Sequence, residues 1–473
     1  MDVLDLTRLQ FAVVTIYHYL FVPLSICLSA TAAGLQIAWL RSRNERHLLL
    51  TKFVGKLLIV TFAVGVVTGL VQEFQFGLGW SAFAKFYGDV FGPTLAIEGM
   101  LAFFLEATFL ALWYFGWERL PRAVHTATIV IVAVGTLLSA YIILAANSFM
   151  QNPVAYAIDA TTGRAHLTSF RELMTNEVVL AAFPHTMAGA MMAGGGLLMA
   201  IGVWRTVADN AFRTLGRLGA WLMLIGGAGT ALSGDHLGKV MTAVQPMKMA
   251  AAEALYETTT GAPFSVFALG RLGHEKPFLT IEIPKLLSFL GTGSFNGTVQ
   301  GIDDLQAQYS AQYGAGSYVP MIPVAFWTFR LMIGAGVLGM AFAAYYLWVS
   351  AASRRLRIPL LPRFLQMGSG TPTWVKRVLL ISPALPAAAN TFGWVFTETA
   401  RQPWLAFGIS KVSDGISPGL TSAEVIASLV GFTVIYGFLA VAWCRLVVHL
   451  SRKPLRPDIS DISDKSAELA PAY

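Results

Sequence analysis

The sequence predicts an all-α integral membrane protein of about nine transmembrane helices, and two observations carry this prediction. Of its 473 residues, 55% are hydrophobic and only 12% are charged, whereas about a quarter of the residues of a soluble domain are charged. Long apolar stretches also recur along the chain, and they approach or exceed the roughly 20 residues that cross a bilayer core. We therefore expect a single membrane domain, residues 1–473, whose apolar surface is covered by lipid.

The apolar stretches follow one another with no soluble domain between them. Asp2 and Asp5 stand before the first stretch, where a secretory signal would be basic, so we expect this first helix to be retained. In chain order, the predicted spans are residues 11–40, 57–71, 94–115, 129–146, 176–204, 215–232, 319–350, 375–396 and 422–449.

The connections between these spans alternate between basic and lightly charged. By the positive-inside rule the basic connections are cytoplasmic, which places the amino terminus outside and the carboxyl terminus, with a tail at 453–473, inside. The basic segments hold Arg41, Arg43 and Arg46; Arg119 and Arg122; Arg205, Arg213 and Arg217; Arg354, Arg355, Arg357, Arg363, Lys376 and Arg377; and Arg445, Arg452, Lys453 and Arg456.

The longest connection, residues 233–318, joins the sixth and seventh predicted helices and lies outside on this topology. Loops of such length are usually functional or disordered. Within it, the segment QPMKMAAAEALYETT predicts a short helix with Ala and Met on one side, which lies on the membrane surface or covers a site.

Charge and cysteine content exclude several classes of function. The formal net charge is +7, but the basic residues follow the topology described above, so we expect no nucleic-acid partner. Cys27 and Cys444 both lie in apolar runs, which indicates neither a disulfide framework nor a cysteine metal site. A metal would therefore need other ligands.

Ionisable side chains deep in a span are costly and are candidates for function. Five of the candidate side chains fall in the outer half of the bilayer on the predicted topology, namely His18, Glu98, His185, Met332 and Glu398. Glu106 lies deeper in the third span, and Arg330 lies beside Met332 in the seventh.

Imidazole, thioether and carboxylate groups are ligand types of haem iron, and a His and Met pair gives a six-coordinate, electron-transferring haem. For any one buried His, the alternative is a hydrogen bond that packs two helices. For Met332, the alternative is ordinary packing.

Glu98 and Glu106 are eight residues apart, which is roughly 80° around an α-helix, so both can face one interior side. We interpret them either as a proton path or as neutral carboxyls bonded to neighbouring helices. The other six histidines are predicted to be surface or interfacial: His47, His125, His166, His236, His274 and His449.

Six ordered segments around these residues resemble subunit I of the cytochrome bd quinol oxidases. In chain order they are RLQFAVVTIYHYLFVPLS, EFQFGLGWSAFAKFYGDVFGPTLAIEGMLAFFLEATF, FPHTMAGA, QPMKMAAAE, FRLMIGAG and GWVFTETARQPW. The resemblance covers most of the chain and implies a quinol:oxygen oxidoreductase of the electrogenic bd type.

The resemblance also implies cofactors and their ligands. His185 and Met332 would ligate a low-spin haem b, with Arg330 near its propionates. His18 and Glu398 would ligate a high-spin haem b and a haem d, or a third haem b in its place, and which residue serves which haem stays open.

Further residues are implied to serve the reaction. Glu98 would lie close to the oxygen-reducing iron, and Trp394 would lie near the high-spin pair. Arg401, in the ARQPW segment, is a further catalytic candidate. Glu106 lies deeper in the bilayer than Glu98, so we expect it to relay protons from the inside. Lys248 and Glu253 match the family's quinol-binding loop, and the alternative for them is a solvated surface pair. Their spacing of five is poor for a helical salt bridge, which favours the first interpretation.

Two departures from the family pattern are visible. The segment from Lys248 to Met332 is short, so the chain resembles the short-loop, cyanide-insensitive-oxidase-like branch. The usual GRQPW motif has Ala400 in place of its Gly, which removes backbone freedom in the turn after Glu398.

The expected function is quinol oxidation near the outer face coupled to reduction of O2 to water, which generates a proton gradient without pumping. The alternatives are a membrane cytochrome b that only carries electrons from quinol, a transporter, and a non-catalytic partner subunit. The resemblance implies a heterodimer with a second membrane subunit, a possible small single-helix accessory subunit, ubiquinol or menaquinol as substrate, and a multi-pass location in the bacterial inner (plasma) membrane.

Overall fold

The structure is a computed structural model that describes residues 2–205, 210–270, 272, 277–355 and 373–455. Within these residues, nine helical segments are long and apolar enough to cross a membrane, which confirms the predicted number. They are α1 (Val3–Ser42), α2 (Glu45–Leu78), α3 with η1 and α4 (Ser81–Phe115), α5 (Arg122–Gln151), α6 with α7 (Phe170–Arg205), α8 (Asn210–Val244), α12 (Ile322–Arg355), α13 with α14 (Thr373–Thr399) and α15 (Ser422–Arg452).

Most of these helices are longer than the apolar stretches that predicted them, because their polar end turns extend beyond the apolar segment. The side chains of Asp2, Asn44 and Thr421 cap the first turns of α1, α2 and α15, which satisfies amide groups that a helix leaves without partners. The third span is not one regular helix, since α3 (Ser81–Gly99) passes into the π-helix η1 (Met100–Glu106) before α4 (Ala107–Phe115).

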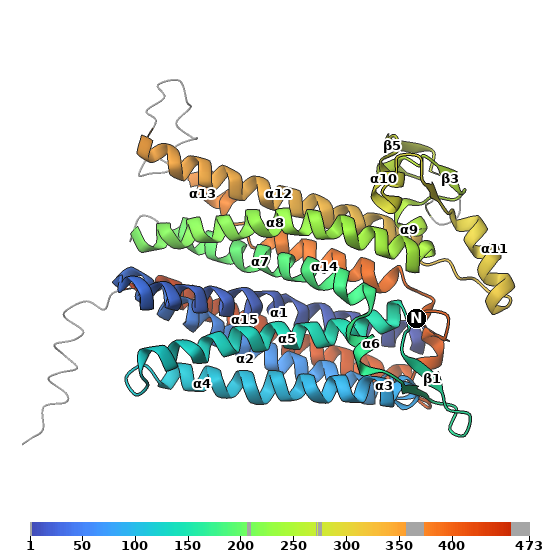
Figure 1. The fold of residues 1–473 in the computed structure, drawn as a ribbon, viewed down its shortest axis with the longest axis horizontal. Helices are drawn as coiled ribbons and strands as arrows, with labels where there is room; N and C mark the ends of the chain where they lie inside the picture. The colour runs from blue at the N-terminus through green and yellow to red at the C-terminus, as the bar shows by residue number, and fades with distance from the viewer. Residues whose placement is uncertain (1, 206–209, 271, 273–276, 356–372, 456–473) are drawn as a thin grey trace, which may run out of the picture.

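The helices run lengthwise in one bundle (Figure 1), with α1 packed against α2, α5, α7, α14 and α15. The α7–α8 pair packs so closely that glycines are required in its interface. A Cβ at Gly202 would lie 2.3 Å from the Cα of Gly216, and one at Gly219 would lie 2.4 Å from the backbone nitrogen of Met199. Small residues at such contacts let two membrane helices approach each other.

Apolar side chains fill the bundle in two main regions. One lies between α1, α2, α5, α7 and α8 and includes Leu28, Leu57 and Phe212. The other lies at the end of the bundle where α8 ends, around Met247 and Trp404. This second region holds the long connection against the membrane helices.

The connection between α8 and α12 is folded, and α8 continues to Val244, so residues 233–244 of the predicted loop are helical. The predicted short helix is present as α9. The elements are α9 (Pro246–Glu253), β3 (Thr259–Thr260), β4 (Phe264–Leu269), β5 (Leu279–Ile283), α10 (Leu286–Thr292), β6 (Thr298–Val299) and α11 (Ile302–Tyr313). The strands pair as two antiparallel sheets, β3 with β6 and β4 with β5.

Two further small sheets lie at the same end of the bundle. The strands β1 (Tyr156–Ile158) and β2 (Ala165–Leu167) form a hairpin between α5 and α6 (Phe170–Met174). After α14 (Ala384–Thr399), β7 (Trp404–Ala406) pairs with β8 (Ser410–Lys411) and leads into the 3₁₀-helix η3 (Val412–Gly415). The same end therefore carries all the described strands.

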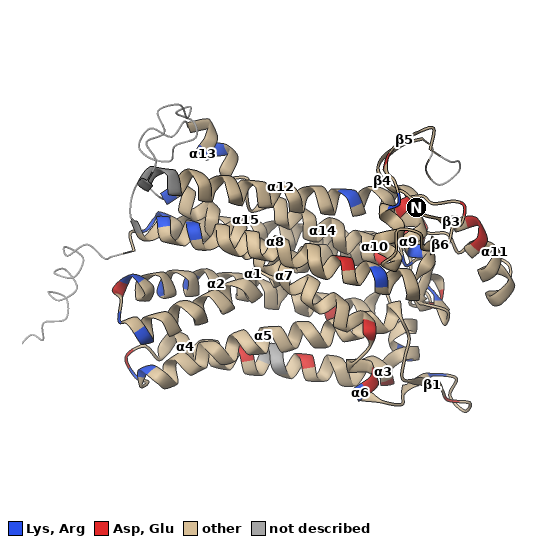
Figure 2. Ribbon diagram, turned by 45° about the horizontal axis from the view of Figure 1, so that its top comes forward, with Lys and Arg blue, Asp and Glu red and all other residues tan. Residues whose placement is uncertain are grey.

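Charged side chains differ between the two ends of the bundle. Lys and Arg gather where α1 ends and α2 begins, whereas acidic side chains are frequent near α3 and α11 (Figure 2). An odd number of spans places the start of α1 and the end of α15 at opposite ends. The outside location of the α9 end stays a prediction of the positive-inside rule.

Several predicted segments are only partly described. The basic segment at 356–372 and the tail beyond residue 455 lie outside the described residues, as does His274. His125 was predicted to be interfacial, and this is wrong, because its side chain is buried and its ring hydrogen-bonds to Gln36 on α1 and to the backbone oxygen of Trp113. It joins α1, α4 and α5.

Candidate functional site

Both candidate histidines are held by one ring nitrogen while the other stays available. On α1, Nδ1 of His18 lies 3.0 Å from Oγ1 of Thr68. The Thr68 hydroxyl donates to backbone oxygens of α2, so it accepts from the imidazole. The proton therefore sits on Nδ1, and Nε2 of His18 presents a lone pair.

The same arrangement recurs at His185 on α7. Its Nδ1 lies 3.1 Å from the backbone oxygen of Thr230 on α8, and a carbonyl oxygen can only accept. Nε2 of His185 is therefore the nitrogen left free to bind a metal. Metal-binding histidines are commonly oriented by such a hydrogen bond from their second nitrogen.

Met332 lies on α12 and touches α14. A Cβ added at Gly393 would lie 2.9 Å from the Met332 sulfur, so the thioether rests directly on the glycine backbone. The helices α7, α8, α12 and α14 contact one another. His185 and Met332 are thus carried by one four-helix group.

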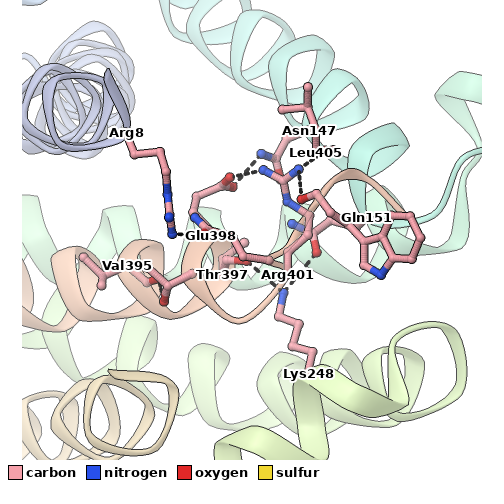
Figure 3. A network of polar contacts seen from close by, with 12 residues as sticks. Arg8, Asn147, Gln151, Lys248, Val395, Thr397, Glu398, Arg401 and Leu405 are labelled. Atoms are coloured by element: carbon pink, nitrogen blue, oxygen red, sulfur yellow. Dashed lines mark hydrogen bonds and ion pairs between the residues drawn. The ribbon is translucent and has the colours of Figure 1, made fainter. Parts of the chain in front are cut away.

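Glu398 lies at the end of α14 in a network of buried polar groups (Figure 3). Its Oε1 accepts a hydrogen bond from Asn147 of α5 at 2.9 Å, and its Oε2 pairs with Arg401 at 2.5 Å. Each carboxylate oxygen keeps a further lone pair. The site therefore holds a carboxylate whose charge is balanced by a buried guanidinium.

The surroundings of Glu398 contain buried donors without partners. Nε of Arg401 and Nε2 of Gln151 have no hydrogen-bond partner, although both atoms are buried. Such orphaned donors call for an acceptor, and the anionic propionates of a haem would supply one. The residues present around Glu398 therefore fit the group that the sequence predicts.

Trp394, on α14, contacts Tyr19, the residue that follows His18 on α1. Its ring stacks on Tyr19, with centroids 5.4 Å apart. The α1 and α14 helices are in contact here. The structure thus brings the His18 region of α1 and Trp394 of α14 to one contact.

Lys248 is not a surface residue, because only 3% of it is exposed. Its Nζ donates to Oε1 of Gln151 and to the backbone oxygen of Thr397, next to Glu398 (Figure 3). Burial lowers the pKa of Lys248 to about 7, against the attraction of Glu398. This Lys can change its charge near neutral pH.

Glu253, five residues on in α9, faces a different helix. It is 5% exposed, and its Oε2 lies 2.8 Å from the guanidinium of Arg330. Burial raises the pKa of Glu253 to about 7, because desolvation outweighs the opposing effect of Arg330. The alternative of a solvated Lys248–Glu253 pair is wrong, since both side chains are buried and each has another partner.

Arg330 directs all its donors at the connection and at its own helix. Besides Glu253, they bond the backbone oxygens of Ser265, Ala252 and Phe326. A guanidinium has five N–H donors, and these contacts use all of them. A contact between Arg330 and a haem propionate stays a prediction.

Glu98 and Glu106 face one strip of α5. Glu98 accepts from Ser139 at 2.9 Å, and a Cβ at Gly135 would lie 3.1 Å from Cγ of Glu106. Gly135 and Ser139 are four residues apart on α5, so they share a face. The buried Oε1 of Glu106 has no partner.

A third carboxyl, which the sequence analysis missed, joins this group. Glu73 of α2 lies within hydrogen-bonding contact of Glu98. The predicted second span ends at residue 71, which leaves Glu73 outside it. The signal was a polar stripe on α2 at Thr68, Gln72 and Gln75, which continues the helix past residue 71.

The described residues contain no group of three or more His, Cys, Asp or Glu that could hold a metal ion by themselves. The candidate ligands are dispersed over α1, α7, α12 and α14. This dispersion is what a large planar cofactor requires, because one or two side chains hold its iron.

Comparisons with known proteins find similar chains along almost the whole sequence. A family model described as cytochrome bd terminal oxidase subunit I matches residues 6–455. The chain is 38% identical to a cytochrome bd ubiquinol oxidase subunit 1 of Bacillus subtilis over 97% of this chain and 95% of the relative. It is 32% identical to a cytochrome bd-II ubiquinol oxidase subunit 1 of Escherichia coli over 95% and 96%.

A solved structure is also similar. The bd oxidase from Geobacillus thermodenitrificans superposes with a TM-score of 0.83 and 26% sequence identity, covering 96% of this chain and 99% of that one. The resemblance found in the sequence therefore extends to the arrangement of the helices.

Proposed function

The chain belongs to the family of cytochrome bd terminal oxidase subunit I, and from this premise we propose which of its residues carry out the reaction. Membership makes the chain a multi-pass bacterial membrane protein and a subunit of a quinol:oxygen oxidoreductase, and it implies haem cofactors and a subunit II as partner. The electron-carrier, transporter and non-catalytic alternatives do not account for this match. The assignments that follow are ours.

Nε2 of His185 and the sulfur of Met332 hold a low-spin haem b. His18 and Glu398 hold a high-spin haem b and a haem d, or a haem b in its place. Bound haem supplies one-electron transfer and, where an axial position is open, oxygen binding. The observation that carries this proposal is that Nδ1 of both histidines is already occupied, which leaves Nε2 as the ligand atom at each site.

Quinol is oxidised next to α9. Glu253 is buried, has a pKa of about 7 and lies beside Arg330, so it can accept a quinol proton near neutral pH and release it at this end of the bundle. Lys248, with a pKa lowered to about 7, acts from the other end of the helix. Ubiquinol and menaquinol both present the hydroxyl groups that this chemistry needs.

Protons for water arrive through the third span. Glu106 lies further from the α9 end than Glu98, and Glu73 and Ser139 bond to Glu98. Two carboxyl groups hydrogen-bond each other only when one carries a proton, so the closeness of Glu73 to Glu98 suits this pair to sharing a proton. Release at one end and uptake from the other separate charge without a pump, across the bacterial inner membrane.

Glu398→Gln in the complex with subunit II tests the oxygen site. An amide lacks the carboxylate charge, so we expect loss of high-spin haem and of quinol-driven oxygen uptake, while the low-spin haem spectrum is retained. Glu172→Gln is the matched control, because Glu172 is exposed at the end of the bundle. Normal oxygen uptake with an unchanged high-spin spectrum in Glu398→Gln would remove Glu398 from the ligand set.

A further inference from the structure

The β4–β5 hairpin exposes several large apolar side chains. On β5, Leu279, Ile281 and Ile283 are 48%, 57% and 46% exposed, and Phe278 before it is also exposed. The hairpin lies outside the membrane-spanning segments. A contiguous exposed apolar surface of this kind marks an interaction site.

Strand pairing gathers these side chains on one face. Directly paired residues of an antiparallel sheet share a face, and Phe267 pairs with Ile281, while Leu269 pairs with Leu279. Phe264 pairs with Ile283 on the same face. This set, Phe264, Phe267, Leu269, Leu279, Ile281 and Ile283, is called the apolar face below.

The opposite face turns toward α9. Ser265 and Ala268 lie on it and are buried. The backbone of Ser265 donates to Glu253 and accepts from Arg330. The β4 residues of this face are therefore fixed to the protein, whereas Glu282 on β5 stays exposed.

One edge of the apolar face contacts the membrane helix α12. The ring of Phe267 meets Trp327 of α12 at 5.4 Å, edge to face, and Phe264 meets Phe329 at 6.4 Å. Trp327 and Phe329 belong to the membrane-spanning segment Ile322–Ser350. Aromatic residues at the ends of membrane helices commonly lie at the interface of the bilayer.

The hairpin overhangs the side of the bundle. Figures 1 and 2 both show β4 and β5 projecting sideways past α12, at the end of the bundle where α8 ends. Along α12 below the hairpin, Leu331, Ile333 and Val337 are exposed and apolar. The apolar face is thus continuous with the surface that α12 presents to lipid.

We propose that the apolar face of the β4–β5 hairpin rests in the interfacial region of the adjacent membrane leaflet, so that the hairpin anchors α9 at the lipid surface. We assign lipid as the partner of the apolar face because this face continues the exposed apolar side of α12. It also lies near the first turns of α12, where a membrane helix meets the bilayer interface. This inference concerns the position of the hairpin and holds whichever residues bind quinol.

Site-directed fluorescence in nanodiscs tests the proposal. The complex with subunit II carries Cys444→Ser, while Cys27 stays because it is buried. An environment-sensitive dye is attached at Ile281→Cys in one sample and at Glu282→Cys in the matched control. Glu282 is the neighbouring residue on the opposite face and is also exposed.

Lipids with a quencher on the upper acyl chain should remove most of the emission at position 281 and little at position 282. A water-soluble quencher should show the reverse order. Equal access of the water-soluble quencher to both positions would overturn the proposal. Protection of position 281 from both quenchers would also overturn it, since a protein surface would then cover the apolar face.

Discussion

In the proposed haem sites, single side chains determine which nitrogen of each histidine is left free for iron. Nδ1 of His18 and Nδ1 of His185 each hydrogen-bond a residue of a neighbouring helix, Thr68 and Thr230 respectively. The orientation of each imidazole therefore depends on a residue that is not itself a candidate ligand. Loss of such an orienting group commonly weakens metal binding by about 10- to 100-fold. The same reasoning applies to Met332, whose position depends on the absence of a side chain at Gly393.

Gly393→Ala should therefore disturb the low-spin haem without removing a ligand. Its new Cβ would lie 2.9 Å from the Met332 sulfur, which is closer than van der Waals contact, so the thioether must move. We expect the low-spin bands of the reduced spectrum to shift or weaken, as they should in Met332→Leu.

The control for this prediction is Gly336→Ala on α12, where a Cβ meets no atom within 4 Å. Its spectrum should equal that of the parent. A normal low-spin spectrum in Gly393→Ala would contradict the placement of Met332 as a ligand.

Glu253 should set the pH dependence of quinol oxidation. Its pKa is about 7, and only the ionised carboxyl can accept a proton. The ionised fraction therefore falls about tenfold for each pH unit below that value, and quinol-driven turnover should fall with it. Glu253→Gln should be slow at every pH, and its turnover should no longer fall as the pH drops below 7. We call this fall the acidic limb, and oxygen uptake with a short-chain quinol measures it.

Two further measurements separate this effect from general damage. Glu282→Gln should move the limb to lower pH, because the Glu282 charge contributes to raising the pKa of Glu253. Oxygen uptake driven by a dye reductant that bypasses α9 should lack the limb. An unchanged limb in Glu253→Gln would assign it to another group.

The sequence predicted the candidate ligands but not the residues that orient them. The depth of His18, His185, Met332 and Glu398 in apolar helices identified them, because polar or ligand-type groups in lipid stand out. The partners Thr68 and Asn147 gave no such signal, since Thr and Asn in a membrane helix usually serve packing. Their roles follow only from which helix lies beside which.

At the scale of elements, α9 is fixed by buried charges near its two ends. Lys248 reaches α5 and α14, and Glu253 reaches Arg330 on α12. One short helix thereby contacts both the helix that carries Met332 and the helix that carries Glu398. A shift of α9 would therefore affect both groups of candidate ligands.

Arg330→Met should loosen the connection around α9. It leaves Glu253 buried without its cation, and breaking a buried pair in this way costs about 3–5 kcal/mol. Trypsin should then cleave faster after the exposed Lys285. The double variant Arg330→Met with Glu253→Gln removes the unpaired charge and should recover most of the protection.

Asp235→Asn supplies the comparison for a half-buried pair within one helix. Its partner Lys239 lies 2.5 Å away on α8, and the two side chains are 36% and 33% exposed. Pairs of residues four apart on a helix contribute only about 0.3–0.5 kcal/mol. Cleavage should change little in this variant. Equal protection in Arg330→Met and the parent would show that the Arg330–Glu253 pair does not hold α9.

Elements were predictable where hydropathy alone defines them. The nine spans and α9 follow from apolar length and composition. The extension of α8 to Val244, the π-helix at Met100–Glu106 and the β4–β5 hairpin did not follow. Polar helix ends resemble loops, a π-helix has no distinct composition, and short strands pair according to tertiary contacts.

At the scale of the whole molecule, the arrangement separates the two proposed proton sites along the bundle. The α9 region lies at one end, and Glu106 lies further along the third span, facing Gly135 of α5. The family model that matches residues 6–455 describes a terminal oxidase subunit, the class of protein in which two such sites would be needed. Neither the partner interface nor the side on which each end lies follows from hydropathy.

Glu106→Gln should slow oxygen reduction and lower the membrane potential together. An amide cannot take up and release a proton as a carboxyl does, and loss of such a group lowers a rate by about 100-fold or more. The measurements are quinol-driven oxygen uptake and a potential-sensitive dye in proteoliposomes. Glu118→Gln, exposed beyond the end of α4, is the control, and full activity with full potential in Glu106→Gln would exclude the relay.

The reduced-minus-oxidised absorption spectrum of the chain purified with subunit II tests the central claim most directly. We expect a low-spin b band from the His185–Met332 site and high-spin bands from the His18 and Glu398 sites, with a further red band if one of these holds haem d. His185→Ala should remove only the low-spin band. A complex without haem absorption, or a low-spin band that persists in His185→Ala, would contradict the ligand assignment on which the account rests.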